Sequence, residues 1–182
     1  MKGRYVVYTV FLLGLMIMLE SCQEPAAGMG KSPVYLTTEP QDVWGLYVDV
    51  YNPVLPGGVS DETFWITIAS HYKDPTGATA SDYATVYIYE YRVTYYRLDG
   101  NPNVPEPFMM HLNSKVEGGS TLELETVVLR SDAKLKSPLK ELVFGGGEGY
   151  IQLNAVIEFF GEDLMDNKLT TKFVLYMRVS DM

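Results

Sequence analysis

Two histidines, His71 and His111, are the first residues to consider for metal chemistry. Two imidazoles and a nearby carboxylate can hold a transition metal. Here a whole predicted strand separates the histidines, and no H-x-H or H-x-x-x-H pattern places both on one face. We therefore interpret them as surface or strand-end residues and expect no transition-metal site.

Nucleophilic catalysis has no recognisable motif in this chain. A hydrolase serine typically lies in a Gly-x-Ser-x-Gly turn, and the sequence contains none. The only cysteine is Cys22, and the glycine-rich run 145–149 lacks the lysine of a phosphate-binding loop. A Ser-His-Asp triad can form from residues far apart in sequence and stays open. We expect no enzymatic activity.

Acidic and amide side chains could bind calcium at two turns. Asp99, Asn101 and Asn103 have the i, i+2, i+4 spacing that opens a calcium loop. Val104 then occupies the position of the required glycine, and Met110 that of the bidentate glutamate. A second cluster lies in the last predicted hairpin and comprises Glu162, Asp163, Asp166 and Asn167. Since Asp and Asn are also common turn formers, we predict no cofactor and keep calcium as an alternative at these turns.

Tyrosine is the most suggestive residue type for binding. The chain has 14 tyrosines and two tryptophans, and tyrosine is amphipathic and rigid enough to serve at an interface. An exposed tyrosine strip could stack on a sugar or contact a protein. The predicted binding residues are Tyr87, Tyr89 and Tyr96. The alternative is that they are cross-strand packing partners.

These tyrosines belong to residues 84–108, the stretch that organises the other predicted strands. It is rich in β-branched and aromatic residues, as a long strand favours. Its apolar residues form two sets of opposite parity: Val86 and Ile88, then Tyr91, Val93 and Tyr95. Because strand side chains alternate between faces, a β-bulge near Tyr89–Glu90 would bring both sets to one face. The alternative is a face lined by tyrosines throughout.

The long strand is predicted to end in a tight turn at Asp99-Gly100. Three prolines between residues 102 and 107 then forbid regular strand pairing until Phe108. A weak strand from Phe108 to Leu112 follows. We predict that the prolines break its pairing with the long strand, which makes it an open edge.

The motif Tyr91-Arg92-Val93-Thr94-Tyr95, followed by Asp99-Gly100, resembles the third strand and following turn of fibronectin type III domains. With the other predicted strands included, the resemblance covers residues 42–181. It departs from the usual pattern in its proline-rich turn and in a long segment between the fifth and sixth strands. Fibronectin-like domains are mostly binding or spacer modules, so the resemblance implies no active-site residues.

Alternating apolar residues predict further strands at the spacing of a β-sandwich. The segments are 44–51, 63–69, 122–129, 151–159 and 169–179. Between the fifth and sixth strands, Ser137 and Pro138 predict a helical turn whose apolar residues cover one open end. We predict an all-β fold, an antiparallel β-sandwich of about seven strands formed by residues 42–182.

The N-terminus has the features of a targeting segment. Lys2 and Arg4 precede an apolar run too short to span a membrane comfortably. Residues 1–21 and the motif Leu19-Glu20-Ser21-Cys22 resemble the signal peptide and lipobox of bacterial lipoproteins. The resemblance implies cleavage before Cys22 and acylation of its sulfur, and Gln23 in place of aspartate implies the outer membrane. The alternative is secretion with Cys22 unmodified.

Residues 22–41 are rich in small, polar, proline and glycine residues, which predicts a flexible tether. Without Lys2, Arg4 and Glu20 of the signal peptide, 12 basic residues stand against 22 acidic ones. Such acidity argues against nucleic acid as a partner.

The sequence therefore predicts a non-catalytic, lipid-anchored envelope protein that contacts the membrane through Cys22. Its sandwich would bind a protein or serve a structural role. The alternative is a glycan-binding module that uses the exposed tyrosines, with or without calcium.

Overall fold

Two β-sheets pack face to face in the part of the chain that the structure describes. The computed structural model describes residues 31–40, 45–74, 76 and 82–181. The alternating apolar and polar stretches form eight strands, and the apolar residues of both sheets meet in one core. The fold is therefore an all-β sandwich, as predicted.

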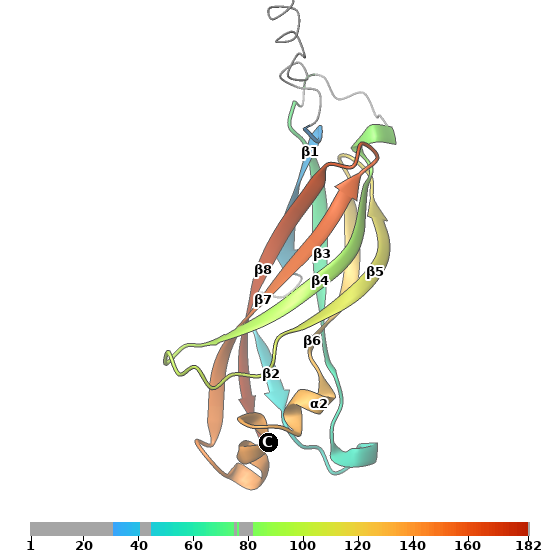
Figure 1. The fold of residues 1–182 in the computed structure, drawn as a ribbon. Coiled ribbons are helices and arrows are strands. Elements are labelled where there is room, and N and C mark those ends of the chain that lie inside the picture. Colours follow the sequence, from blue (N-terminus) through green and yellow to red (C-terminus); the bar gives the residue numbers. More distant parts are fainter. Residues whose placement is uncertain (1–30, 41–44, 75, 77–81, 182) are drawn as a thin grey trace, which may run out of the picture. The chain divides into compact units, whose positions relative to one another are not determined.

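The smaller sheet has three strands and the larger has five. In the order β1-β3-β6, the smaller sheet consists of β1 (Val34–Pro40), β3 (Glu62–Tyr72) and β6 (Thr121–Leu129). The larger sheet consists of β2 (Leu46–Asp49), β8 (Lys168–Ser180), β7 (Tyr150–Asp163), β4 (Val86–Arg97) and β5 (Phe108–Val116), in this order. Figure 1 shows β8, β7, β4 and β5 side by side. Most neighbouring strands in each sheet are not consecutive along the chain, so most connections cross from one sheet to the other.

Short helical segments occupy the connections. They are η1 (Pro56–Gly58), η2 (Asp82–Ala84), α2 (Ser131–Lys134) and η3 (Leu139–Gly145). The predicted turn after Pro138 is η3, and it buries Leu139 and Leu142 completely against the core. In α2, the buried Lys134 ammonium donates to the carbonyl of Asp49 at 2.7 Å and pairs with Glu62 at 2.5 Å. These contacts close one end of the sandwich.

The start of the sandwich differs from the prediction. Residues 34–40, which the sequence predicted to be tether, form β1 and pair antiparallel with β3. The predicted first strand shortens to β2, which runs parallel to β8, so the sandwich is not wholly antiparallel. Among the β1 residues whose burial the structure describes, Val34 and Leu36 are the buried apolar ones. A pattern of two buried apolar residues is a weak predictor of a strand. The backbone hydrogen bonds of β1 are supplied by its neighbour β3.

The β-bulge predicted in the long strand is present. The register of β4 with β7 shifts between Ile88 and Glu90. The extra residue switches parity as expected, because the apolar residues on both sides of it are buried: Val86, Ile88, Tyr91, Val93 and Tyr95.

Strand β5 is an edge of the larger sheet, as predicted, but the predicted reason is wrong. Its pairing with β4 is not broken and runs from Val93 opposite Phe108 to Val86 opposite Val116. The prolines lie in the connection before β5, where no ladder hydrogen bond is required of them. The strand is an edge because no described strand lies on its other side.

Tyrosine hydroxyls join the two sheets. Strand β6 has a bulge at Val128, which the register skips between Val127 and Leu129. The Tyr95 hydroxyl donates to the Val128 carbonyl at 2.8 Å, and the Tyr91 hydroxyl accepts from the Val127 amide at 3.1 Å. The bulge therefore obtains the hydrogen bonds that its own ladder lacks.

Candidate functional site

The outer face of the five-stranded sheet is divided into two halves of different chemistry. Side chains at alternate positions of β4, β7 and β8 point away from the core, and the strand register aligns them in rows across the sheet. The rows nearer the β7–β8 hairpin carry charged residues. The rows nearer the opposite end carry tyrosines and few charges.

In the charged half, the exposed tyrosines Tyr87 and Tyr89 have charged residues as neighbours. Tyr87 aligns with Lys115 on one side and Glu162 on the other. Lys168 pairs with Glu162, and its ammonium lies 5.3 Å from the centre of the Tyr89 ring. The Tyr89 ring is therefore engaged with a cation of the protein itself, and Tyr87 has charged residues as its neighbours in register.

The opposite half contains the aromatic surface, which we define as Tyr47, Tyr96, Tyr150, Val174 and Tyr176. Register explains how four strands bring these residues together. Tyr96 of β4 aligns with Asn154 of β7, which aligns with Tyr176 of β8. In the next row Gln152 aligns with Arg178, which lies beside Tyr47 of β2.

Local contacts hold the aromatic surface in place. The Gln152 amide donates to the Tyr176 hydroxyl at 2.8 Å, and the Arg178 guanidinium lies 4.6 Å from the centre of the Tyr150 ring. Gly45 has a φ of 87°, and a Cβ there would lie 2.6 Å from Cδ1 of Tyr176. Only glycine therefore lets the backbone before β2 lie against the Tyr176 ring.

Exposure of the aromatic surface is high for large apolar side chains. Tyr47 is 63% exposed, Tyr96 60% and Val174 51%. The rings offer flat apolar area and hydroxyl donors at low cost in side-chain entropy, which suits a protein interface or stacking on a sugar ring. None of the five residues that define this surface is charged, but Arg178 lies beside Tyr47 and over the Tyr150 ring, so a ligand that covers the surface also contacts one guanidinium.

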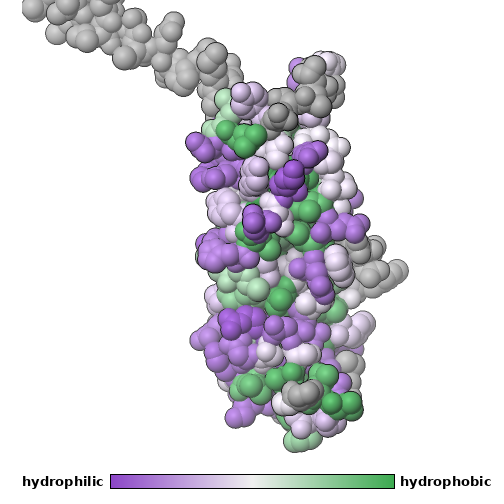
Figure 2. Space-filling model, turned by 90° about the vertical axis from the view of Figure 1, so that its right-hand side faces the viewer, coloured by the Kyte–Doolittle hydropathy of each residue, from purple (hydrophilic) through white to green (hydrophobic). Residues whose placement is uncertain are grey.

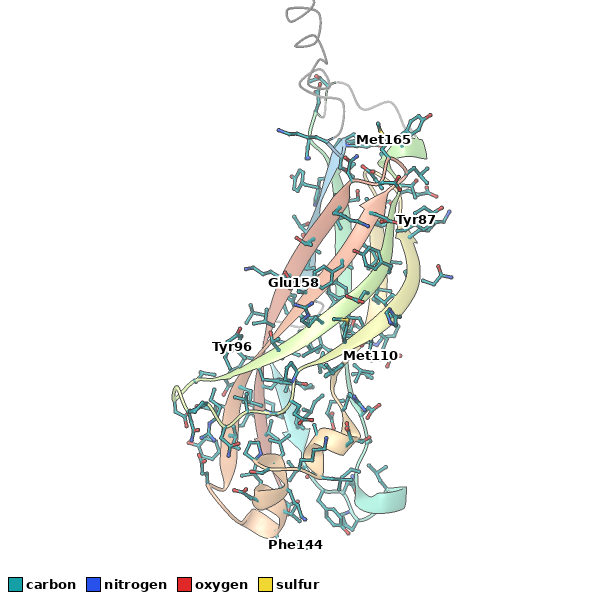
Figure 3. The ribbon with its side chains drawn as sticks, viewed as in Figure 1. Tyr87, Tyr96, Met110, Phe144, Glu158 and Met165 are labelled. Atoms are coloured by element: carbon teal, nitrogen blue, oxygen red, sulfur yellow. The ribbon has the colours of Figure 1, made fainter. Side chains whose placement is uncertain are left out.

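The predicted binding tyrosines do not form one site. Tyr96 belongs to the aromatic surface, whereas Tyr87 and Tyr89 lie in the charged half. Nine residues of extended strand separate Tyr87 from Tyr96, which corresponds to roughly 30 Å, and Figure 3 shows them near opposite ends of β4. The prediction missed Tyr47, Tyr150 and Tyr176. The available signal was their parity, since each alternates with buried residues of its strand.

At the first predicted calcium turn, the Asp99 carboxylate is hydrogen-bonded to the Arg97 guanidinium. The buried Arg97 guanidinium donates to Asp99 at 3.0 and 2.5 Å and to Glu148 at 3.0 Å. These hydrogen bonds lower the pKa of Asp99 and Glu148 and raise that of Arg97. Asn101 accepts from the backbone amide of Asn103, as in an Asx turn. The arrangement joins the turn after β4 to the loop before β7.

The second predicted calcium turn is organised by Asp163. Its buried carboxylate accepts hydrogen bonds from the Met165 amide and from the backbone and side chain of Asn167. Burial acts to raise the pKa of Asp163, but these hydrogen bonds outweigh it and the pKa lies below its ordinary value. Asp166 is exposed with a φ of 60°. Within the described ranges no three His, Cys, Asp or Glu side chains are grouped to hold a metal.

The two histidines lie in different sheets. His71 of β3 stacks on Tyr35 with ring centres 5.1 Å apart and hydrogen-bonds Thr37 at 2.8 Å. His111 of β5 is exposed, with Nδ1 3.7 Å from the Glu90 carboxylate. They do not approach a common centre.

Two surface depressions lie away from the aromatic surface. One, of about 310 Å³, is lined by Phe108, Arg130 and Lys136 among others. Its charges are paired with each other, since Lys136 contacts Glu106 at 3.1 Å and Arg130 contacts Asp132 at 3.1 Å. The other, of about 510 Å³, is open and lies beside the stacked Tyr35 and His71.

The predicted lipidation residue, Cys22, lies outside the described residues. Among those residues no helix is long and apolar enough to cross a membrane. Comparison of the chain with protein-family models gives no match, and comparison with curated proteins gives none either.

Proposed function

We propose that this chain is a non-catalytic lipoprotein of a bacterial envelope. It is anchored through acylated Cys22, and its membrane is the outer membrane. Its sandwich serves as a fibronectin type III or immunoglobulin-like module that binds another protein. The anchor is supported by the apolar run that ends in the lipobox-like Leu19–Cys22 segment.

The aromatic surface is the observation that carries the proposed binding function. It gathers four tyrosines and a valine from β2, β4, β7 and β8, and several are more than half exposed. Tyrosine is enriched, and charged residues are depleted, at the centres of protein interfaces. A partner that covers these rings would remove exposed apolar area from water without desolvating a carboxylate.

Strand β5 offers the partner a second means of attachment. It is a nine-residue edge with a single charged side chain, Lys115, apart from His111. An open edge has unpaired amides and carbonyls that an extended segment of another protein can satisfy. Met109 and Met110, both exposed, would supply apolar contacts beside such a segment.

Glycan binding is the second candidate function. One specific observation favours it: the amides of Asn154 and Gln152 lie in register with Tyr96, Tyr176 and Arg178. Aromatic rings can stack on the apolar face of a sugar, and neighbouring side-chain amides can hydrogen-bond its hydroxyls.

The test is crosslinking of the full-length lipoprotein in its native envelope. A photoreactive residue at position 96 is expected to give an adduct with one protein, identified by mass spectrometry, whereas the same residue at position 87 is not. A glycan array probed with the detergent-solubilised chain is the complementary experiment. Micromolar glycan binding that is lost with Tyr96→Ala would overturn the protein-partner proposal in favour of the glycan.

A further inference from the structure

The turn between β7 and β8 presents two large apolar side chains to solvent. Leu164 is 48% exposed and Met165 is 50% exposed. The residues on either side of them are Asp163, Asp166 and Asn167, which are of the types that form turns. Leucine and methionine are not typical turn formers. We call Leu164 and Met165 the hairpin tip.

Hydrogen bonds of Asp163 hold the backbone of the hairpin tip. The Asp163 carboxylate accepts from the Met165 amide at 2.9 Å and from the Asn167 amide at 3.0 Å. The Asp166 amide donates to the Asp163 carbonyl at 3.0 Å, and the Asp163 amide donates to the Asn167 carbonyl at 3.1 Å. The two apolar side chains therefore extend from an ordered turn that other residues stabilise.

Tyrosines and a lysine lie behind the hairpin tip on the neighbouring strands. Val86 of β4 aligns with Asp163, and η2 directly precedes this strand at the same end of the sheet. Tyr83 of η2 is 60% exposed. In the next row from the tip, the exposed Tyr87 aligns with Lys115 of β5. Apolar side chains at the extremity, followed by tyrosines and lysines, suit the interface of a bilayer, where aromatic rings and long cationic side chains lie at headgroup level.

Lysines balance the glutamates of the strands beside the hairpin tip. Lys168 pairs with Glu162, and Lys115 pairs with Glu117 at 3.5 Å. Asp166 adds one exposed carboxylate in the turn itself. A surface with such balanced charge is neither strongly attracted to an anionic membrane nor strongly repelled by a zwitterionic one.

The described sandwich begins at the same end as the hairpin tip. Ser32 hydrogen-bonds the Asp163 carboxylate, and the Lys73 amide donates to the Pro33 carbonyl at 2.9 Å. Figure 1 shows the start of β1 and the turn between β7 and β8 at one end of the sandwich. The chain that leads back to Cys22 is therefore attached beside the hairpin tip.

The length of this chain limits how far the hairpin end can be from the proposed lipid anchor. Nine residues, 23–31, lie between Cys22 and Ser32. Ten steps from Cα to Cα span at most roughly 35 Å, whatever conformation the residues adopt. With acyl chains on Cys22, the bilayer surface is therefore always within this distance of Ser32. Such a short connection gives the bilayer a high effective concentration at the hairpin tip.

The opposite end of the sandwich is not held in this way. Figure 2 shows hydrophobic surface at the lower end of the molecule, where Figure 3 places Phe144. The 13 residues of β8 separate that end from the hairpin tip by roughly 40 Å. This distance exceeds the full length of the chain between Cys22 and Ser32. The anchor therefore favours the hairpin end for contact with the membrane.

We propose that the hairpin tip lies in the interface of the bilayer that holds acylated Cys22, with Leu164 and Met165 in contact with lipid. This inference rests on the proposed lipoprotein function. The occupant is a bilayer with zwitterionic headgroups, and Tyr83 and Tyr87 lie at the level of these headgroups. The aromatic surface lies in the half of the sheet away from the membrane, where a partner protein can reach it.

The test measures lipid contact at position 165 of the full-length acylated chain in phosphatidylethanolamine-rich vesicles. Cys22 is the only cysteine and its sulfur carries the acyl chain, so a Met165→Cys variant has one thiol for an environment-sensitive fluorophore. Lipids with a nitroxide on the acyl chain should quench this fluorophore. The same fluorophore in a Phe144→Cys variant is the control, because Phe144 is exposed at the other end, and it should not be quenched. No quenching at position 165, or equal quenching at both positions, would overturn the proposal.

A charge in the hairpin tip separates lipid contact from proximity to the anchor. In the labelled Met165→Cys chain, Leu164→Asp should reduce quenching at least about twofold, because a carboxylate opposes entry into the acyl region. Phe144→Asp in the same labelled chain should leave quenching unchanged. Both positions are exposed, so the melting temperatures should stay close to the original. Undiminished quenching with Leu164→Asp would mean that the anchor alone brings the probe near lipid, which contradicts the proposal.

Mass spectrometry of the same preparation distinguishes failure of this inference from failure of the proposed function. An unmodified Cys22 would overturn the lipid anchor and, with it, the argument from chain length. An acylated Cys22 without quenching at position 165 would overturn the membrane contact alone.

Other occupants of the hairpin tip give other results. A disulfide-linked dimer of the unlabelled Met165→Cys chain, in place of quenching, would assign the tip to a second copy. A protein adduct from a photoreactive residue at position 165 in the native envelope, in place of quenching, would assign it to a partner protein. Either result would overturn the proposed lipid contact.

Discussion

The inner and outer faces of the five-stranded sheet use the same residue type for different purposes. On β4, Tyr95 points inward and its hydroxyl bonds the bulge of β6, whereas the adjacent Tyr96 points outward and is 60% exposed. The two tyrosines are adjacent in one aromatic run, so their sequence context does not distinguish them. Parity alone decides which tyrosine stabilises the sandwich and which is available to a partner.

The same contrast recurs at neighbouring positions of β7. Ile157 is fully buried and Val156 faces outward, while Asp163 is buried at the end of the strand and Glu162 forms a surface ion pair. Each adjacent pair is a matched comparison of similar side chains on opposite faces. The two faces should therefore respond differently to the same substitution.

The largest effect is expected at Ile157→Asp. An isolated carboxylate in the core costs several kcal/mol or more, which is comparable with the ~5–15 kcal/mol stability of a whole domain. The control Val156→Asp puts the same group one residue away on the outer face, and it should cost about 1 kcal/mol or less. Chemical denaturation followed by circular dichroism measures both. A folded, cooperative Ile157→Asp variant would contradict the inward direction of this side chain.

Asp163→Asn should have the next largest effect, about 1–3 kcal/mol, because it removes a buried charge that accepts several hydrogen bonds. Glu162→Gln should cost less than about 1 kcal/mol, since its ion pair with Lys168 is at the surface.

The Asp163 carboxyl also predicts that the stability of the fold depends on pH. The pKa of Asp163 is lower in the folded state than its ordinary value. Its contribution to stability is therefore complete above about pH 4 and is lost as pH falls through the folded pKa. Melting temperatures between pH 7 and pH 2 should fall less steeply for Asp163→Asn than for the unmodified chain. Equal slopes would show that another group controls acid unfolding.

Tyr95→Phe should cost about 1 kcal/mol, because the buried Val128 carbonyl loses its donor. Tyr96→Phe, on the outer face, should cost almost nothing. Burial also raises the pKa of Tyr95 and Tyr91 above the ordinary value near 10. A raised folded pKa contributes stability below pH 10 that is lost as pH rises further, so Tyr95→Phe should flatten the decline of the melting temperature in alkali.

The smallest effect on stability, and a large effect on binding, is expected at Tyr96→Ala. The exposed side chain contributes little to folding, so the melting temperature should stay within about 2–4 °C of the original. Partner affinity should fall at least about tenfold if the aromatic surface is the interface. Tyr87→Ala is the control from the charged half and should leave affinity unchanged. Equal losses from both variants would mean that the interface extends along the whole sheet.

Much of the fold could be predicted because alternation is a local signal. The β7 and β8 hairpin was predicted from unbroken alternation between Ile151 and Val179, and both strands are present. A parity change between Ile88 and Tyr91 was enough to predict a bulge in β4. The helical turn predicted from Ser137 and Pro138 is present as η3, but its N-cap is Pro138 and Ser137 makes no capping hydrogen bond.

The candidate site was less accessible to prediction. Exposed tyrosines on β4 were predicted, but the aromatic surface combines Tyr96 with residues of three other strands. The register between strands determines which rings are neighbours, and register depends on pairing between segments far apart in the chain. The contact between the rings of Tyr51 and Phe144 has the same origin, since these residues meet only after folding.

The sequence by itself determined the all-β class and the parity of the long strands, because both depend on the alternation of neighbouring residues. The tertiary structure alone decided that residues 34–40 join the sandwich, that β2 runs parallel to β8, and that Asp99 binds Arg97. In each case the deciding partner is distant in sequence or is set by how the side chains pack. Unpaired backbone groups and charges take the partners that the folded sheets bring within reach.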